Sequence, residues 1–91
     1  MWETADPDGR RVILSAARWL HVCERHPDLG GRPEDLLEVV ANPDARKPGR
    51  EPGEEWFYRR SVGPSRWIRV VVHYERKEGR ITTAFARRGM P

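Results

Sequence analysis

Residues 66–75 read Arg-Trp-Ile-Arg-Val-Val-Val-His-Tyr-Glu, and this stretch decides the fold. It is rich in aromatic and β-branched residues, a composition that predicts a β-strand. Successive side chains of a strand point to opposite faces, so the segment divides into two sets. The set that suits a floor for packed helices is Ile68, Val70, Val72 and Tyr74. The other set predicts an open, basic and aromatic face and consists of Trp67, Arg69, Val71 and His73.

One more strand is predicted before this one, over residues 55–60, and one after it, over residues 80–87. The turns that separate them are Val62-Gly63-Pro64-Ser65 and Lys77-Glu78-Gly79. Links this short indicate antiparallel pairing. A short edge strand at about residues 44–47 is a further candidate. In residues 80–87 the set Ile81, Thr83 and Phe85 alternates with Thr82, Ala84 and Ala86, and the sequence does not fix which set faces the helices.

Two helices are predicted before the strands. Ser15 is an N-cap for a helix that runs to about Arg25, and Pro27 disfavours helical geometry beyond that point. The apolar side of this helix contains Ala16, Trp19, Leu20, Val22 and Cys23, and His26 falls on the same side. A second helix begins at Pro33 and ends at Asn42-Pro43.

The predicted fold class is therefore α+β, with two N-terminal helices packed on one face of a three- to four-stranded antiparallel sheet. Residues 11–88 form a single domain in this prediction, and Arg11–Leu14 is a short extended segment at its start. Residues 1–10, which include the turn cluster Asp6-Pro7-Asp8-Gly9, are expected to be a flexible lead-in.

Composition limits the class of protein. A chain of 91 residues has room for one core, and its single cysteine, Cys23, excludes an internal disulfide. The first ten residues lack the apolar core of a signal peptide, so a soluble cytoplasmic protein is expected, with no membrane partner. The net charge of +3 and the 17 cationic residues, mostly arginine, permit nucleic-acid binding but do not establish it.

Several chemistries find no support in the sequence. His21, Cys23 and His26 lie close together, but on a helix they point in different directions, so no metal site is expected. Cys23 sits on the apolar side of the helix, where a free cysteine usually acts as a small hydrophobic residue. The chain contains neither a glycine-rich phosphate loop nor a dinucleotide fingerprint, so no cofactor is expected.

The two helix histidines each have a structural and a functional interpretation. The imidazole of His26 either hydrogen-bonds the last carbonyls of the helix or carries protons at near-neutral pH. His21 lies off the apolar side, beside Arg18 and Arg25. That group is either a solvated helix face or an anion-seeking acid–base site.

The strand arginines also have two interpretations. Arg59, Arg69 and Arg87 lie on three successive strands. They either pair with nearby carboxylates on a solvated face or form a cationic surface that binds a phosphate. The rings of Trp56, Tyr58 and Trp67 lie between them in the sequence and either stack nucleobases or belong to the core.

The order of short motifs along the chain resembles the phage-associated branch of the barnase/EndoU/colicin/RelE-like nucleases and, less closely, the RelE-type and BrnT-type toxins. The likeness covers about residues 11–87. Its motifs are Trp19-x-His21, Arg25-His26-Pro27, Asn42-Pro43-Asp44, Glu55-x-Phe57-Tyr58-Arg59, Arg69-Val70-Val71-Val72 and Ile81-Thr82-Thr83-Ala84-Phe85.

This resemblance implies metal-independent cleavage of RNA, in which the ribose 2′-hydroxyl attacks its own phosphate. It also implies that His21 and His26 carry protons, that Arg59 and Arg69 clamp the phosphate, and that Thr83 hydrogen-bonds the substrate. Arg25, His73 and Arg87 complete the expected substrate contacts. The expected partners are RNA and a small antitoxin protein. Two alternatives stay open: a non-catalytic module that binds RNA or a protein, and a structural phage or mobile-element protein.

Overall fold

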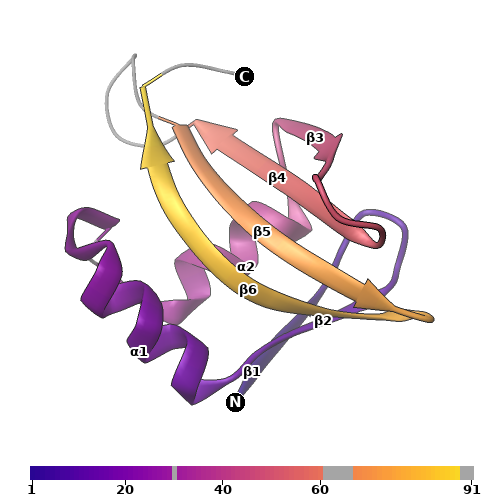
Figure 1. Cartoon of the computed structure of the whole chain (residues 1–91), viewed down its shortest axis with the longest axis horizontal. Helices are drawn as coiled ribbons and strands as arrows, with labels where there is room; N and C mark the ends of the chain where they lie inside the picture. Colours follow the sequence, from indigo (N-terminus) through magenta and orange to yellow (C-terminus); the bar gives the residue numbers. More distant parts are fainter. Residues whose placement is uncertain (30, 61–66, 89–91) are drawn as a thin grey trace.

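The computed structural model describes residues 1–29, 31–60 and 67–88 (Figure 1). Six strands, two α-helices and one 3₁₀-helix follow one another along these residues. Their order is β1 (Trp2–Ala5), β2 (Arg11–Leu14), α1 (Ala16–Arg25), η1 (Pro27–Leu29), α2 (Pro33–Ala41), β3 (Ala45–Pro48), β4 (Glu54–Arg60), β5 (Trp67–Glu75) and β6 (Glu78–Arg87). The predicted turn at residues 62–65 lies outside the described residues.

The sheet differs from the prediction. It has six strands in the order β1-β2-β6-β5-β4-β3, and the pairing of β2 with β6 is parallel while the other pairs are antiparallel. The prediction of a three- to four-stranded antiparallel sheet preceded by two N-terminal helices is therefore wrong. The strands β1 and β2 precede the helices, and β2 pairs with the last strand, β6. This parallel contact joins residues distant in sequence, so no local pattern reveals it.

Residues 1–10 are not a flexible lead-in, because they contain β1 and the turn that pairs it with β2. The Asp6 amide donates to the Arg10 carbonyl at 2.9 Å, and the Asp6 carboxylate accepts from the backbone amides of Asp8 and Arg10. Gly9 has a φ of +86°, a left-handed conformation that glycine adopts without strain. The turn cluster therefore closes a hairpin.

The helices begin and end as predicted, but α1 packs differently. Ser15 caps α1 by accepting a hydrogen bond from the Arg18 amide at 3.1 Å. Within α1 only Val22 is buried, while Cys23 is exposed and Leu20 retains 59% of its accessible surface. The apolar side of α1 is thus narrower than predicted, because α1 lies beside β6 at one margin of the sheet (Figure 1). No helix among the described residues has the length and apolar character needed to cross a membrane.

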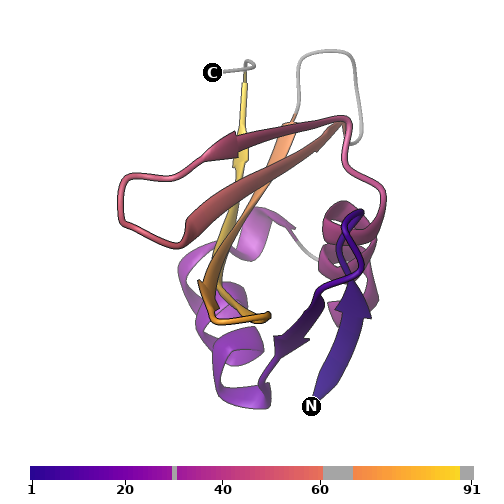
Figure 2. The same cartoon turned by 90° about the vertical axis from the view of Figure 1, so that its right-hand side faces the viewer.

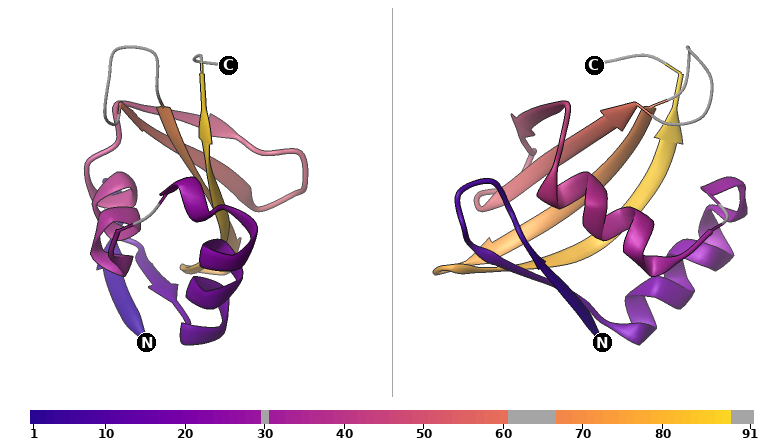
Figure 3. Two further views of the ribbon diagram at one scale, coloured as in Figure 1. Left: turned by 90° about the vertical axis from the view of Figure 1, so that its left-hand side faces the viewer. Right: turned by 180° about the vertical axis from the view of Figure 1, so that it is seen from behind.

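The core lies between α2 and the curled sheet. Viewed from the side and from behind, α2 crosses one face of the sheet and β1 lies against the same helix (Figures 2 and 3). Leu36, Val39 and Val40 of α2 are buried there. The sheet contributes Val12, Leu14, Phe57, Val70, Val72, Tyr74, Ile81 and Ala84. The set Ile68, Val70, Val72 and Tyr74 therefore forms the helix-facing side of β5, as its alternation predicted.

A β-bulge in β6 settles which side of that strand faces the helices. The register runs Val71–Thr83 and then Val72–Ile81, so Thr82 is an extra residue, and its hydroxyl donates to the Val71 carbonyl at 3.3 Å. The bulge shifts the alternation by one residue. As a result Ile81 joins Ala84 in the core, whereas Thr83 and Phe85 lie on the opposite face.

A buried polar cluster ties the β1–β2 hairpin to the sheet. The Tyr74 hydroxyl donates to Asp6 Oδ2 at 2.7 Å, and Arg10 Nε donates to the same oxygen at 2.8 Å. The Arg10 guanidinium lies 3.7 Å from the centre of the Tyr74 ring and also donates to Glu55 at 2.6 Å. Burial alone raises the pKa of the Asp6 carboxyl, but these hydrogen bonds outweigh burial and bring the pKa below 3.8. Burial and the Asp6 carboxylate raise the pKa of Tyr74 above 10.0.

This cluster predicts a loss of stability at both ends of the pH scale. The lowered Asp6 pKa contributes stability that is lost as pH falls below about 4, and the raised Tyr74 pKa contributes stability that is lost above about pH 10. We expect Tyr74→Phe to abolish the alkaline loss and to lower the free energy of unfolding at pH 7 by about 1–3 kcal/mol, because Asp6 loses a buried donor. Urea denaturation at about pH 2.5, 7 and 11 measures both effects. An alkaline loss that persists in Tyr74→Phe would contradict the assignment.

Candidate nucleic-acid interface

The face of the sheet turned away from α2 carries three rows of side chains from β4, β5 and β6. Cross-strand pairing places Tyr58, Arg69 and Phe85 in the central row, since Arg69 is the register partner of both rings. The rows on either side are Arg60–Trp67–Arg87 and Trp56–Val71–Thr83. We call these nine residues the open face. The prediction that Trp67, Arg69 and Val71 share a face opposite the helices is confirmed.

Arg69 is the centre of the open face. Only 8% of its surface is accessible, and Nε donates to the Tyr58 hydroxyl at 2.7 Å. Its guanidinium carbon lies 4.0 Å from the centre of the Trp56 ring and 5.1 Å from the centres of the Tyr58 and Phe85 rings. The Trp56 indole is itself fixed by a 2.8 Å hydrogen bond to Glu54. Three rings and one hydroxyl therefore hold this cation in place.

Arg69 lacks a carboxylate partner among the described residues, which distinguishes it from two partly buried arginines on the other side of the sheet. Arg10 pairs with Asp6 and Glu55, and Arg46 pairs with Asp8 and Glu55. A buried charge without an opposite charge is costly, and cation–π contacts compensate only in part. The described side chains contain no fully buried polar atom without a partner, so the terminal guanidinium nitrogens reach the surface. The accessible part of the Arg69 guanidinium therefore lies among the rings of Trp56, Tyr58 and Phe85 and faces no carboxylate of the described residues.

Arg59 lies on the other face of the sheet. Its register partner is Ile68, which faces the helices. Nη1 donates to the Asn42 carbonyl at 2.7 Å and lies 3.3 Å from the Glu38 carboxylate, so Arg59 ties β4 to the C-terminal end of α2. Because the sheet separates Arg59 from Arg69, these two residues do not form the expected phosphate clamp.

His26 reaches the open face from the end of α1. Its backbone amide caps the helix by donating to the Val22 carbonyl at 2.8 Å. The imidazole has no hydrogen bond to any described residue and lies against Phe85, with 5.6 Å between the ring centres. Phe85 therefore contacts both the His26 imidazole and the Arg69 guanidinium. His26 also borders a small cavity of about 160 Å³, which Trp19, Val22 and Leu29 help to line.

The remaining predicted site residues do not all gather around Arg69. Thr83 and Arg87 lie on the open face, diagonal to Arg69 across β5 and β6. His73 is four residues from Arg69 along β5, about 13 Å away, and lies 4.0 Å from Glu75. His21 and Arg25 lie on α1 and have no ion pair with a described residue. Since they are four residues apart, they project from one side of the helix, away from the direction of His26.

Sequence reasoning did not assign a role at the site to Phe85. The bulge at Thr82 is what turns its ring toward the open face, and a bulge depends on pairing with another strand. Tyr58 was considered as a stacking ring or a core residue, and neither interpretation included the hydrogen bond by which its hydroxyl holds Arg69. The alternation of residues 55–60 puts Tyr58 on the same side of the strand as Trp56 and Arg60, and this pattern was the available signal.

The location of Arg59 predicts a purely structural role. Arg59→Ala should lower the free energy of unfolding by about 1 kcal/mol, because a hydrogen bond from a charged group to the end of α2 is lost. We expect the affinity for single-stranded RNA to stay unchanged. Thermal denaturation and fluorescence anisotropy with a labelled oligonucleotide measure the two properties, and a fall in affinity at unchanged stability would place Arg59 in the interface.

For Arg69 we expect the opposite effect on stability, because its burial costs free energy. In the double variant Tyr58→Phe/Arg69→Met, the chain loses a buried cation together with its hydroxyl acceptor, and side-chain volume is roughly kept. We expect the free energy of unfolding to stay the same or to rise by about 1–4 kcal/mol, as in other replacements of buried charge by apolar groups. Urea denaturation tests this, with Arg69→Met alone as the control that leaves the Tyr58 hydroxyl unpaired. A large loss of stability in the double variant would make Arg69 a structural residue.

The open face can bind an anion at Arg69 and stack planar groups on the partly accessible rings of Trp56 and Trp67, whereas the Tyr58 ring is buried. The His26 imidazole, which has no hydrogen bond to a described residue, lies at the margin of the open face. Among the described residues, no three His, Cys, Asp or Glu side chains come close enough together to hold a metal ion. Comparison of the chain with protein-family models, with curated proteins and with solved structures finds no match.

Proposed function

We propose that this protein is a metal-independent endoribonuclease that binds single-stranded RNA on the open face. The observation that carries the proposal is Arg69, a nearly buried guanidinium held by the Tyr58 hydroxyl and by the rings of Trp56, Tyr58 and Phe85. It lacks a carboxylate partner among the described residues. A cation kept in this state suits a ligand that supplies the negative charge, and a backbone phosphate does so. The motif order that resembles the barnase/EndoU/colicin/RelE-like nucleases supports the same reaction.

The aromatic side chains suit single-stranded RNA. Unstacked bases bind to exposed ring faces, and each stacked base contributes about 1–3 kcal/mol. Trp56 and Trp67 are both partly accessible, and they lie in the rows on either side of Arg69. A strand that crosses the sheet can therefore stack bases on these rings while one of its phosphates meets Arg69.

In the proposed reaction the ribose 2′-oxygen attacks the adjacent phosphorus. A bond forms between the 2′-oxygen and phosphorus, and the bond from phosphorus to the 5′-oxygen breaks, which leaves a 2′,3′-cyclic phosphate and a free 5′-hydroxyl. The Arg69 guanidinium stabilises the charge that develops on the phosphoryl oxygens. His26 takes the proton of the 2′-hydroxyl, and water supplies the proton of the leaving 5′-oxygen.

Cleavage of single-stranded RNA in the presence of EDTA tests this proposal. The wild-type protein should release fragments that end in 2′,3′-cyclic phosphate. His26→Ala should lower the rate roughly 10²–10⁴-fold, the usual contribution of a positioned acid–base group. Arg69→Met should lower it about 10²–10³-fold and should also reduce the salt dependence of binding by about one charge.

Arg59→Ala is the matched control, because it also removes an arginine from the sheet but on the helix-facing side. It should cleave at the wild-type rate. Binding of RNA without cleavage by the wild-type protein would support the non-catalytic binding module instead. Cleavage that Arg69→Met does not slow would remove Arg69 from the reaction.

A further inference from the structure

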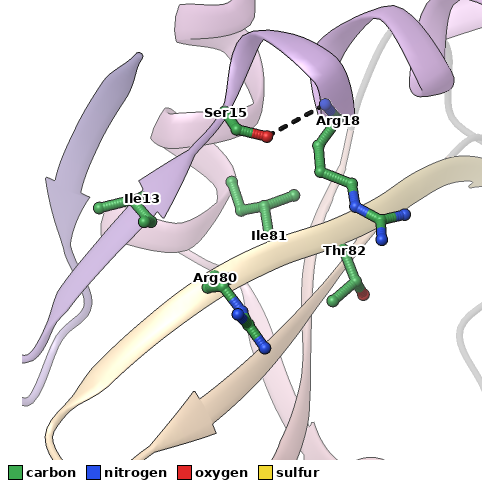
Figure 4. Close-up of a pocket in the computed structure, with 6 residues that line it drawn as sticks. All are labelled: Ile13, Ser15, Arg18, Arg80, Ile81 and Thr82. Atoms are coloured by element: carbon green, nitrogen blue, oxygen red, sulfur yellow. Dashed lines mark hydrogen bonds between the residues drawn. The ribbon is translucent and has the colours of Figure 1, made fainter.

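A groove of about 390 Å³ lies between the start of α1 and β6, where β2 ends (Figure 4). β2 pairs with β6 only as far as Ile13 and Arg80. Beyond Arg80, α1 takes the place of a neighbouring strand beside β6. The residues that line the groove are Ile13, Ser15, Arg18, Arg80, Ile81 and Thr82.

Two guanidinium groups share this groove, and no acidic side chain lines it. Arg18 has no ion pair with a described residue. Arg80 has one, at 3.2 Å to Glu75, in which both side chains are more than half exposed, so solvent weakens it strongly. Figure 4 shows the Arg18 and Arg80 side chains on the same side of the β6 ribbon, with Thr82 between them along the strand. Two like charges at one groove, of which only Arg80 has a solvent-exposed acidic partner, favour a bound anion.

Helix stability does not explain the position of Arg18. It lies in the first turn of α1, where the helix macrodipole disfavours a cation. That turn contains no acidic residue, whereas the first turn of α2 contains Glu34 and Asp35. A positive charge is therefore concentrated at the groove although a negative one would stabilise the helix.

The groove reaches the side of the sheet that carries the open face. Arg80 is the register partner of His73, which lies on the same side of β5 as Arg69. Along β6, Thr82 and Arg80 are three and five residues from Phe85, which corresponds to roughly 10–17 Å. A few nucleotides of a single strand can span this distance.

We infer that the groove binds a second backbone phosphate of the RNA strand whose scissile phosphate lies at Arg69. The inference rests on the proposed endoribonuclease function and adds a direction to it, since the strand runs along β6 from Phe85 toward Arg80. Arg18 and Arg80 hold the second phosphate, and the hydroxyl groups of Ser15 and Thr82 lie beside it. Substrates too short to reach the groove therefore bind to the Arg69 site alone.

A comparison of substrate lengths tests this inference. Cleavage is measured on a dinucleotide and on a single-stranded RNA of about a dozen nucleotides, a length within the usual range of single-strand sites. Arg18→Gln should lower kcat/KM for the longer RNA about tenfold, the effect of one lost charge-assisted hydrogen bond, and should leave the dinucleotide unchanged. Arg50→Gln is the control, because it removes an exposed arginine from the loop before β4. Circular dichroism melting checks that each variant folds.

A second variant should strengthen the binding of RNA at the groove instead of weakening it. Glu75→Gln removes the carboxylate that competes for Arg80, so the affinity for the longer RNA should increase, and it should increase more than in the loop control Glu51→Gln. If Arg18→Gln and Arg50→Gln behave alike while the wild-type protein cleaves RNA, the groove inference fails and the proposed function stands. Equal losses on both substrates in Arg18→Gln also overturn the inference. If the wild-type protein neither binds nor cleaves either RNA, both proposals fail.

Discussion

The extra residue at Thr82 is the constraint on which both faces of the sheet depend. Its hydroxyl holds the Val71 carbonyl at 3.3 Å, and the register of β6 against β5 steps by one residue at this point. In a regular strand Ile81 and Phe85 would share one face, because they are four residues apart. The bulge instead sends Ile81 into the core and brings Phe85 against Arg69. A single inserted residue therefore lets one strand close the core and complete the candidate site.

The two sides of the sheet differ in the partners that their arginine side chains have. On the helix-facing side, Arg10, Arg46 and Arg59 each have carboxylate partners, and their contacts fasten the first hairpin, β3 and α2 to the central strands. On the open face, Arg69 is held by aromatic rings and a tyrosine hydroxyl. The first arrangement cancels charge and stabilises the fold. The second preserves charge, and it reduces the cost of burial without removing it.

Local patterns predicted those elements whose causes are local. The Ser15 cap, the end of α1 before Pro27 and the two sides of β5 follow from capping, from proline geometry and from strand alternation. The parallel pairing of β2 with β6 and the Thr82 bulge depend on contacts between distant residues, and both were missed. The same distinction between local and distant causes applies to the residues of the candidate site. Arg69 was correctly placed on the open face because β5 has one apolar side, whereas β4 carries aromatic rings on both sides, so its alternation left the side of Arg59 undecided.

The contacts that hold Arg69 and those that hold His26 differ in kind, and this difference bears on the proposed reaction. The Arg69 guanidinium is fixed before any ligand arrives, since Tyr58 binds Nε and the Trp56 ring above it is fixed by Glu54. Preorganised charge is effective because no reorganisation is needed during the reaction. His26 is fixed through its backbone, by hydrogen bonds with Val22 and Leu29, while its imidazole lies against the Phe85 ring and has no hydrogen bond to a described residue. Because no described residue occupies its ring nitrogens, the imidazole keeps both of them available for the proton transfer that the proposed reaction assigns to it.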